Sequence, residues 1–243
     1  MTSTDDTGAI INRLTGDKPL RVWSLIVTIF GDMAPGKDDW LSGATLGQLT
    51  APLGVRPEAL RVALHRLRKD GWIESCRNGR VSTHRLSAMG RAEREIAAPQ
   101  IYEHTPPETL WLVLSDPQVA AQDGPVWIGQ GVGLSALPVA DFCHSVEPAQ
   151  LPDWMRARTV SPDLVAECAR VAEGLARLGQ HISGKDRPDP NDLVPLRILA
   201  VHVWRRIALK TPDLPDAALP VDWRGAEARQ AFKSVLDQIP KGT

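Results

Sequence analysis

The chain has few cysteines and no long hydrophobic run. Its three cysteines, Cys76, Cys143 and Cys168, lie far apart in a sequence of 243 residues. An odd number of scattered cysteines argues against a disulfide framework and a cysteine-rich zinc site, and it favours a reducing compartment. No apolar run approaches the ~20 residues that a membrane-spanning helix needs. The first residues are polar and acidic and do not resemble a secretory signal. We therefore expect a cytoplasmic protein.

Sequence motifs that carry catalysis are also missing. The six histidines form no HExxH arrangement, and no Ser/His/Asp set is evident. The pair Cys143-His144 has no second pair at zinc-binding spacing. Gly129, Gly131 and Gly133 form an incomplete nucleotide-loop pattern without a strand-turn-helix context, so they indicate turns. We expect neither an enzyme nor a bound cofactor or metal.

Positive charge is concentrated in one segment of this almost neutral chain. Ten lysines or arginines and four acids lie between Arg56 and Arg94, which gives that segment a balance of +6. The whole chain carries −1, so the remainder carries −7. Segregation of this kind indicates a polyanionic partner for one part of the molecule.

The start of this basic segment has the pattern of an amphipathic helix. Pro57 suits the first helical turn, where its missing N–H costs nothing. Apolar residues recur at i, i+4 and i+7 and form one stripe, namely Leu60, Leu64 and Leu67. At about 100° per residue, three basic residues share the flank of that stripe: Arg61, His65 and Arg68. The sequence thus predicts a helix with a core face and a cationic face.

A basic β-hairpin is predicted directly after this helix. Residues 72–75 form an extended run, and residues 81–86 form a second one. Asn78-Gly79 between them is a strong two-residue hairpin signal, and Arg77 and Arg80 bracket it. Asp70-Gly71 ends the preceding helix.

Upstream residues complete a recognisable order of elements. Residues 20–30 predict a mostly buried helix and residues 44–51 a short one, with Gly54 supplying a turn before the basic helix. Helix, short helix, turn, basic helix and basic hairpin is the order of a winged helix-turn-helix. We expect DNA contacts from Arg56, Arg61, His65, Arg66, Arg68, Arg77, Arg80 and Arg85. The alternative is that these arginines form an ordinary solvated surface.

Several short sequences carry a family resemblance. They are GD at 31–32, RVALHRL at 61–67, GW at 71–72, RNGR at 77–80 and HRLS at 84–87. These resemble the amino-terminal domain of the PaaX family, repressors of phenylacetate catabolism, and residues 196–232 resemble that family's terminal helical domain. The resemblance implies a winged-helix head, a small ferredoxin-like middle domain related to Cas2 proteins, and a helical tail. It further implies a repressor of an aromatic-acid operon that an aryl- or acyl-CoA thioester releases from DNA.

The fold class expected from these observations is α+β and mostly helical. Residues 1–98 would form the winged helix-turn-helix, residues 99–150 a small α+β middle domain, and residues 151–243 a helical domain. The middle domain is short, because residues 109–115 form a strand and the segment from Gly124 to Pro148 holds only one or two more. Three helices are predicted in the tail, at 164–178, about 191–210 and about 223–239.

Function-bearing residues outside the head are harder to predict. Arg205 or Arg206 would meet the phosphates of a CoA ligand, as guanidinium groups do well. His202 lies beside them, and Trp111 would line an aryl pocket. The alternative is that His202 is a hydrogen-bonded core residue and that the two arginines tie down helix ends or acidic loops.

We predict a homodimer that binds an operator in double-stranded DNA, an inverted repeat read by two heads, together with a small-molecule effector. Two other classes of function remain open at this point. One is a metal-dependent nuclease that uses Asp116 in the middle domain. The other is a ligand-binding or scaffold protein that has lost DNA binding.

Overall fold

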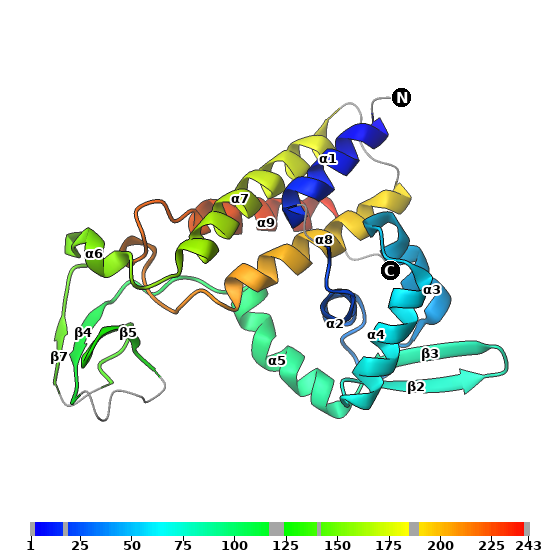
Figure 1. Ribbon diagram of the computed structural model, residues 1–243, viewed down its shortest axis with the longest axis horizontal. Helices are drawn as coiled ribbons and strands as arrows, with labels where there is room; N and C mark the ends of the chain where they lie inside the picture. Colours follow the sequence, from blue (N-terminus) through cyan, green and yellow to red (C-terminus); the bar gives the residue numbers. More distant parts are fainter. Residues whose placement is uncertain (1–2, 17–18, 117–123, 140–141, 185–189, 241–243) are drawn as a thin grey trace.

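The computed structural model is α+β and mostly helical (Figure 1), and it describes residues 3–16, 19–116, 124–139, 142–184 and 190–240. The helices are α1 Ser3–Thr15, α2 Val22–Met33, α3 Gly43–Thr50, α4 Pro57–Lys69, α5 Ala88–Tyr102, α6 Asp153–Arg156, α7 Pro162–Ser183, α8 Pro190–Ala208 and α9 Gly225–Gln238. Three short 3₁₀ helices are η1 Ala51–Leu53, η2 Pro148–Gln150 and η3 Asp216–Ala218. The strands are β1 Leu41–Ser42, β2 Ile73–Asn78, β3 Val81–Leu86, β4 Trp111–Leu114, β5 Val126–Gly129, β6 Val132–Ser135 and β7 Phe142–Ser145.

The molecule is elongated, with a small sheet at each end of a helical body. The β2–β3 hairpin projects at one end, and the sheet containing β4 and β7 lies with α6 at the other (Figure 1). Helices α1, α7, α8 and α9 form the body between them, and α5 runs from the hairpin towards the second sheet. None of the described helices is both long enough and apolar enough to cross a membrane.

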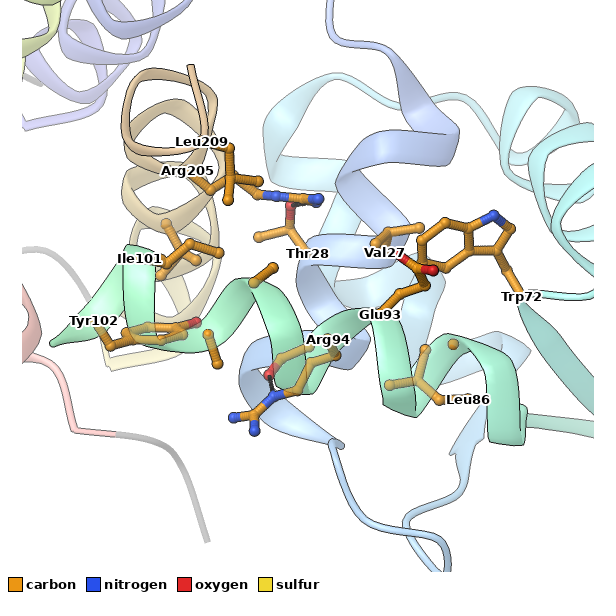
Figure 2. Close-up of a pocket in the computed structure, with 15 residues that line it drawn as sticks. Val27, Thr28, Trp72, Leu86, Glu93, Arg94, Ile101, Tyr102, Arg205 and Leu209 are labelled. Carbon is orange, nitrogen blue, oxygen red and sulfur yellow. Dashed lines mark hydrogen bonds between the residues drawn. The ribbon is translucent and has the colours of Figure 1, made fainter. Parts of the chain in front are cut away.

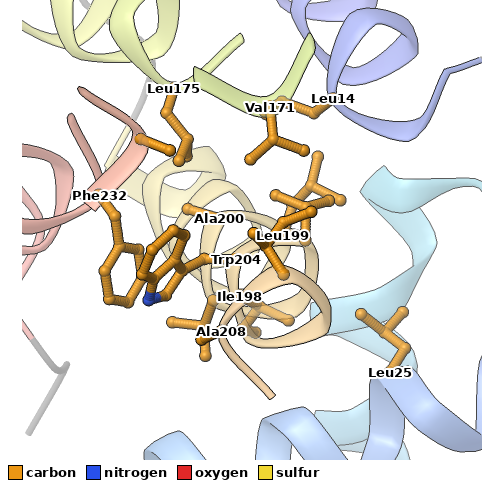
Figure 3. Close-up of a cluster of buried hydrophobic side chains, with 14 of the residues drawn as sticks. Leu14, Leu25, Val171, Leu175, Ile198, Leu199, Ala200, Trp204, Ala208 and Phe232 are labelled. Atoms are coloured by element: carbon orange, nitrogen blue, oxygen red, sulfur yellow. The ribbon is translucent and has the colours of Figure 1, made fainter. Parts of the chain in front are cut away.

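Helix α8 is the centre of the hydrophobic core. Every side chain from Pro195 to Trp204 is buried, as expected for a helix that is surrounded on all sides. Trp204 stacks on Phe232 of α9, with ring centroids 5.5 Å apart. Figure 3 shows Val171 and Leu175 of α7 approaching α8 from a different side. Helix α2 also packs against α8, so the amino-terminal helices share one core with the carboxyl-terminal ones.

A buried ion pair joins these two parts of the chain. The Arg197 guanidinium donates to both carboxylate oxygens of Asp32 at 2.8 and 3.0 Å, and Asp32 is fully buried. The Tyr102 hydroxyl donates to the same carboxylate at 3.0 Å. Burial and the neighbouring Asp32 raise the pKa of Tyr102, so its hydroxyl keeps the proton that it donates. Arg197 also donates to the Ile239 carbonyl at 2.6 Å, which connects α2, α5, α8 and the residue after α9.

The second sheet holds more strands than the sequence predicts. Its order is β5-β6-β4-β7, and every neighbouring pair is antiparallel. The prediction of one or two strands between Gly124 and Pro148 was wrong, because this segment forms β5, β6 and β7. Each of these strands has four residues, and Gly129 and Gly133 interrupt their alternation, which weakens the period-two signal.

Two details of the first sheet also differ from expectation. Asn78 pairs with Val81 in the strand ladder, so the two-residue loop is Gly79-Arg80 rather than Asn78-Gly79. Gly79 has φ of +60°, the left-handed conformation that glycine adopts at the first central position of a hairpin turn. The two-residue strand β1 joins the other edge of β3 and was not predicted.

The domain boundary expected between residues 98 and 99 falls inside α5, so this helix continues from the first predicted domain into the second.

Removing the buried carboxylate should destabilise the whole protein. We expect Asp32→Ala to lower the free energy of unfolding by about 3–5 kcal/mol, because Arg197 would stay buried without a counter-charge. Urea denaturation measures this change. Asp38→Ala, at an exposed position on the loop that follows α2, is the control and should cost less than about 0.5 kcal/mol. Equal effects of the two substitutions would contradict the structural role of the ion pair.

Candidate nucleic-acid interface

Helices α3 and α4 are joined by a tight, well-defined connection. The Ser42 hydroxyl caps α3 by accepting from the Thr45 backbone N–H at 2.9 Å. Gly54 follows η1 with φ of +78°, a conformation that residues with a Cβ rarely adopt. Pro57 is the first residue of α4. The order of elements predicted for this part of the chain is therefore confirmed.

Helix α4 has one buried face and one exposed, basic face. Leu60, Ala63, Leu64 and Leu67 are buried, and α4 packs against α2. The exposed residues of the helix interior are Arg61, Val62, His65, Arg66, Arg68 and Lys69. The apolar stripe fixes how the helix is rotated, and that rotation turns the basic residues to solvent.

A groove lies between this basic face and the hairpin. It has a volume of about 530 Å³, and α3 contributes to its walls. Arg61, His65 and Arg68 line it from α4, which confirms that they lie together. The hairpin contributes Ser75, Ser82 and His84. The two serines were not predicted, although the pairing of the two strands places Ser75 opposite His84.

Two arginines that line the groove have no acidic partner among the residues that the structure describes. Across the part of the chain that the structure describes, neither Arg61 nor Arg68 has a carboxylate within ion-pair distance. The His84 ring accepts or shares a hydrogen bond with the Ser75 hydroxyl at 2.8 Å. Burial, and then the nearby charge of Arg68, lower the pKa of His84. The lowered pKa favours the neutral ring, so Arg61 and Arg68 bring fixed positive charge to the groove.

The remaining predicted DNA contacts are arranged in two ways. Arg56 precedes α4 and is exposed. Arg80 occupies the hairpin tip and is exposed, while the neighbouring Arg77 donates from Nε to the Gly79 carbonyl at 3.1 Å. Arg66 forms an exposed i,i+4 pair with Asp70 at 3.5 Å, which solvent screens strongly. These arginines are accessible to a partner.

Arg85 differs from the others, because the protein already uses its guanidinium. It donates to Glu74 at 2.7 and 3.0 Å and to the Lys37 carbonyl at 2.7 Å. It also lies over the Trp40 ring, 4.6 Å from the ring centre. These contacts hold the base of the hairpin to the loop that precedes β1. The guanidinium of Arg85 is therefore engaged within the protein.

Of the four residues predicted to bind an effector, His202 and Arg205 both contact the Thr28 hydroxyl, whereas Trp111 and Arg206 do not join them there. Trp111 lies on β4 in the second sheet. His202 is buried and shares a hydrogen bond between Nδ1 and the Thr28 hydroxyl at 3.1 Å. Arg206 pairs with Glu167 of α7 at 3.0 Å. Arg205 also lines a cavity between α2, α5 and α8 (Figure 2).

Comparison with known proteins identifies the family. Residues 21–90 match the family model described as PaaX-like protein, and residues 164–242 match the model described as PaaX-like protein C-terminal domain. Together the two matches cover more than half of the sequence. The chain belongs to the PaaX-like family. The first match contains α2, α3, α4 and the hairpin, and the second contains α8 and α9.

A curated relative of this PaaX-like protein has a described role. The transcriptional repressor PaaX of Escherichia coli K12 is 29% identical to it, in an alignment that covers 91% of this chain and 81% of the relative. The nuclease alternative finds no support in these comparisons. Within the described ranges, no three His, Cys, Asp or Glu residues come together as metal ligands would.

The buried histidine should make stability depend on pH. Burial, and then the charges of Arg205 and Arg206, lower the pKa of His202 to about 3. Between this value and the ordinary histidine pKa of about 6.5, only the unfolded chain binds the proton. The free energy of unfolding should therefore fall as the pH falls through this window, by at most about 1.4 kcal/mol per pH unit from this residue.

Urea denaturation between pH 7 and pH 4 tests this linkage. His202→Gln should have a shallower pH dependence than the wild-type protein, because the substitution removes the group that protonates on unfolding. His65→Gln, which removes an exposed histidine of α4, is the matched control. Parallel curves for the wild-type and His202→Gln proteins would contradict the assignment.

Proposed function

We propose that this PaaX-like protein is a sequence-specific DNA-binding transcriptional repressor. The observation that carries the proposal is the groove between α4 and the hairpin, where Arg61 and Arg68 are exposed and have no acidic partner among the described residues. Removing water from these two guanidinium groups is costly unless the partner supplies negative charge. The phosphates of duplex DNA supply it. The name of the E. coli relative, a transcriptional repressor, supports the same function.

In this proposal the head acts as a winged helix-turn-helix. Helix α4 enters the major groove, where Arg61 and His65 meet base edges. Arg77 and Arg80 on the hairpin hold phosphates or reach the adjacent minor groove. Arg56, Arg66 and Arg68 contact phosphates of the DNA backbone and so fix the position of α4 in the groove. Arg85 keeps the hairpin at the correct angle through Glu74 and Trp40.

Two further elements of the proposal come from the family resemblance. A homodimer would present two heads to an inverted repeat, with half-sites about one DNA turn or a multiple apart. An aryl- or acyl-CoA thioester would release the repressor from the DNA of a phenylacetate-type operon. It would do so by binding the DNA-free arrangement of the two heads more tightly than the DNA-bound arrangement. The antiparallel strand order β5-β6-β4-β7 is that of a βαββαβ unit and supports a ferredoxin-like middle domain. It is a shortened one, because the described residues between β6 and β7 form no helix.

Arg80 should contribute through phosphate contact alone. We expect Arg80→Ala to weaken binding to all duplex sequences alike and to reduce the slope of log K against log salt concentration by about 0.9. Fluorescence anisotropy with a random-sequence duplex at several salt concentrations measures this slope. Arg177→Ala, an exposed arginine of α7, is the control and should leave the slope unchanged. An unchanged slope in Arg80→Ala would remove the hairpin tip from the interface.

Arg61 should contribute to sequence preference. We expect Arg61→Ala to cost about 1–3 kcal/mol on the preferred site and to relax the choice of base at particular positions. Selection of sites from a random duplex library, followed by titration of the enriched site, measures both effects. If the variant selects the same motif with the same affinity as the wild-type protein, α4 does not read bases through Arg61.

A further inference from the structure

A cavity of about 170 Å³ lies where the head meets the helical body. Helices α2 and α5 form two of its walls, and α8 forms the third (Figure 2). Trp72 and Leu86, at the base of the hairpin, also line it. Glu93 and Leu209 belong to the lining and are exposed, so the cavity opens to solvent.

The walls of this cavity are mainly apolar. The apolar lining residues include Val27, Leu86, Ala97, Ala98, Ile101 and Val201. An apolar protein cavity of about 150 Å³ accommodates a molecule the size of benzene. The space therefore suits one aromatic ring or a short alkyl chain, and it is too small for a nucleotide.

One cation in this cavity has no acidic partner. The other two arginines of α8 are paired, Arg197 with Asp32 and Arg206 with Glu167. Arg205 instead donates from Nη1 to two neutral oxygens, the Thr28 hydroxyl at 3.1 Å and the Ser24 carbonyl at 3.3 Å. No described carboxylate lies within ion-pair distance of it. Burial lowers the pKa of Arg205, which reflects the cost of holding this charge away from water.

The other polar groups of the lining are engaged or lie elsewhere. Arg94 donates to the Gly31 carbonyl at 3.2 Å, and Figure 2 shows its guanidinium turned away from the cavity. The Tyr102 hydroxyl donates to Asp32. Glu93 lies beside Val27 and Trp72, whereas Arg205 lies beside Leu209 (Figure 2). Arg205 thus supplies the positive charge at its own end of the cavity.

We propose that this cavity binds a small apolar monocarboxylate, with the ligand carboxylate on Arg205 and its ring or alkyl chain between α2, α5 and α8. The anion supplies the counter-charge that Arg205 lacks, and a charge-assisted bond to a partly desolvated guanidinium is among the stronger polar contacts. The apolar part fills the space beside Val27 and Ile101. A thioester carbonyl carries no net charge and would leave Arg205 uncompensated.

The position of the site couples it to the DNA-binding surface. Helix α2 carries the face against which α4 packs, and α5 leads directly from the hairpin. A ligand between these helices and α8 would shift the head relative to the body. This regulatory consequence rests on the proposed function, whereas binding of the carboxylate does not.

Calorimetric titration of the full-length protein tests the site with matched pairs of probes. Phenylacetate and hexanoate should bind, and their neutral amides, phenylacetamide and hexanamide, should bind at least tenfold more weakly. Arg205→Gln should weaken phenylacetate binding ten- to hundredfold and abolish the preference for acid over amide. Arg177→Ala is the charge control and should leave binding unchanged. Equal binding of acid and amide to the wild-type protein, or of acid to Arg205→Gln, would overturn the proposal.

A second variant keeps the test independent of any folding defect at Arg205. Ala98→Leu narrows the cavity and retains the charge, so it should exclude phenylacetate while thermal unfolding confirms a folded protein. Phenylacetyl-CoA serves as a further probe. Binding of this thioester in the absence of binding by the free acid would overturn the assignment of a carboxylate site.

DNA anisotropy with and without phenylacetate separates the two proposals. Arg205-dependent binding of the acid together with a changed DNA affinity supports both the site and its coupling. Binding of the acid with an unchanged DNA affinity supports the site and refutes the coupling. A protein that binds the acid and no DNA would contradict the proposed function while leaving the carboxylate site established.

Discussion

The buried ion pair between Asp32 and Arg197 sets the relation between the two ends of this protein. Removing two charges from water is costly, and the cost is recovered only where the remaining donors and acceptors are satisfied. Tyr102 and the Ile239 carbonyl do this for Asp32 and Arg197, respectively. Helix α2, which supports α4, is therefore fixed to α8 and α9. The orientation of the DNA-binding surface depends on the helical body.

Helix α8 connects the core, the ion pair and the cavity in one element. Arg197 contacts Asp32 from the middle of this helix, and Trp204 packs on Phe232. About two turns after Arg197, Arg205 faces α2 and the cavity. All three contacts belong to one helix, which also packs against α2, the helix that supports α4.

Local patterns predicted most of the head. The stripe of Leu60, Leu64 and Leu67 indicated both the existence of α4 and the face that carries Arg61. The hairpin was also predicted. Its loop lies one residue later than expected, because Asn78 pairs with Val81 and belongs to the strand. Long-range contacts left weaker signals. Asp32 lies beyond the buried helix predicted for residues 20–30, and nothing local points to its partner Arg197, 165 residues away. His202, Arg205 and Arg206 are neighbours in sequence, yet His202 and Arg205 meet at the Thr28 hydroxyl while Arg206 pairs with Glu167.

Recovery of genomic DNA fragments by the purified protein tests the central claim most directly. Sheared DNA from the organism that encodes the chain is captured at moderate salt and sequenced, with wild-type protein and Arg61→Ala in parallel. The account predicts that wild-type protein enriches a discrete site with an inverted repeat and that Arg61→Ala loses this preference while retaining general affinity. Absence of enrichment by wild-type protein, or an identical profile for both proteins, would contradict sequence reading by α4.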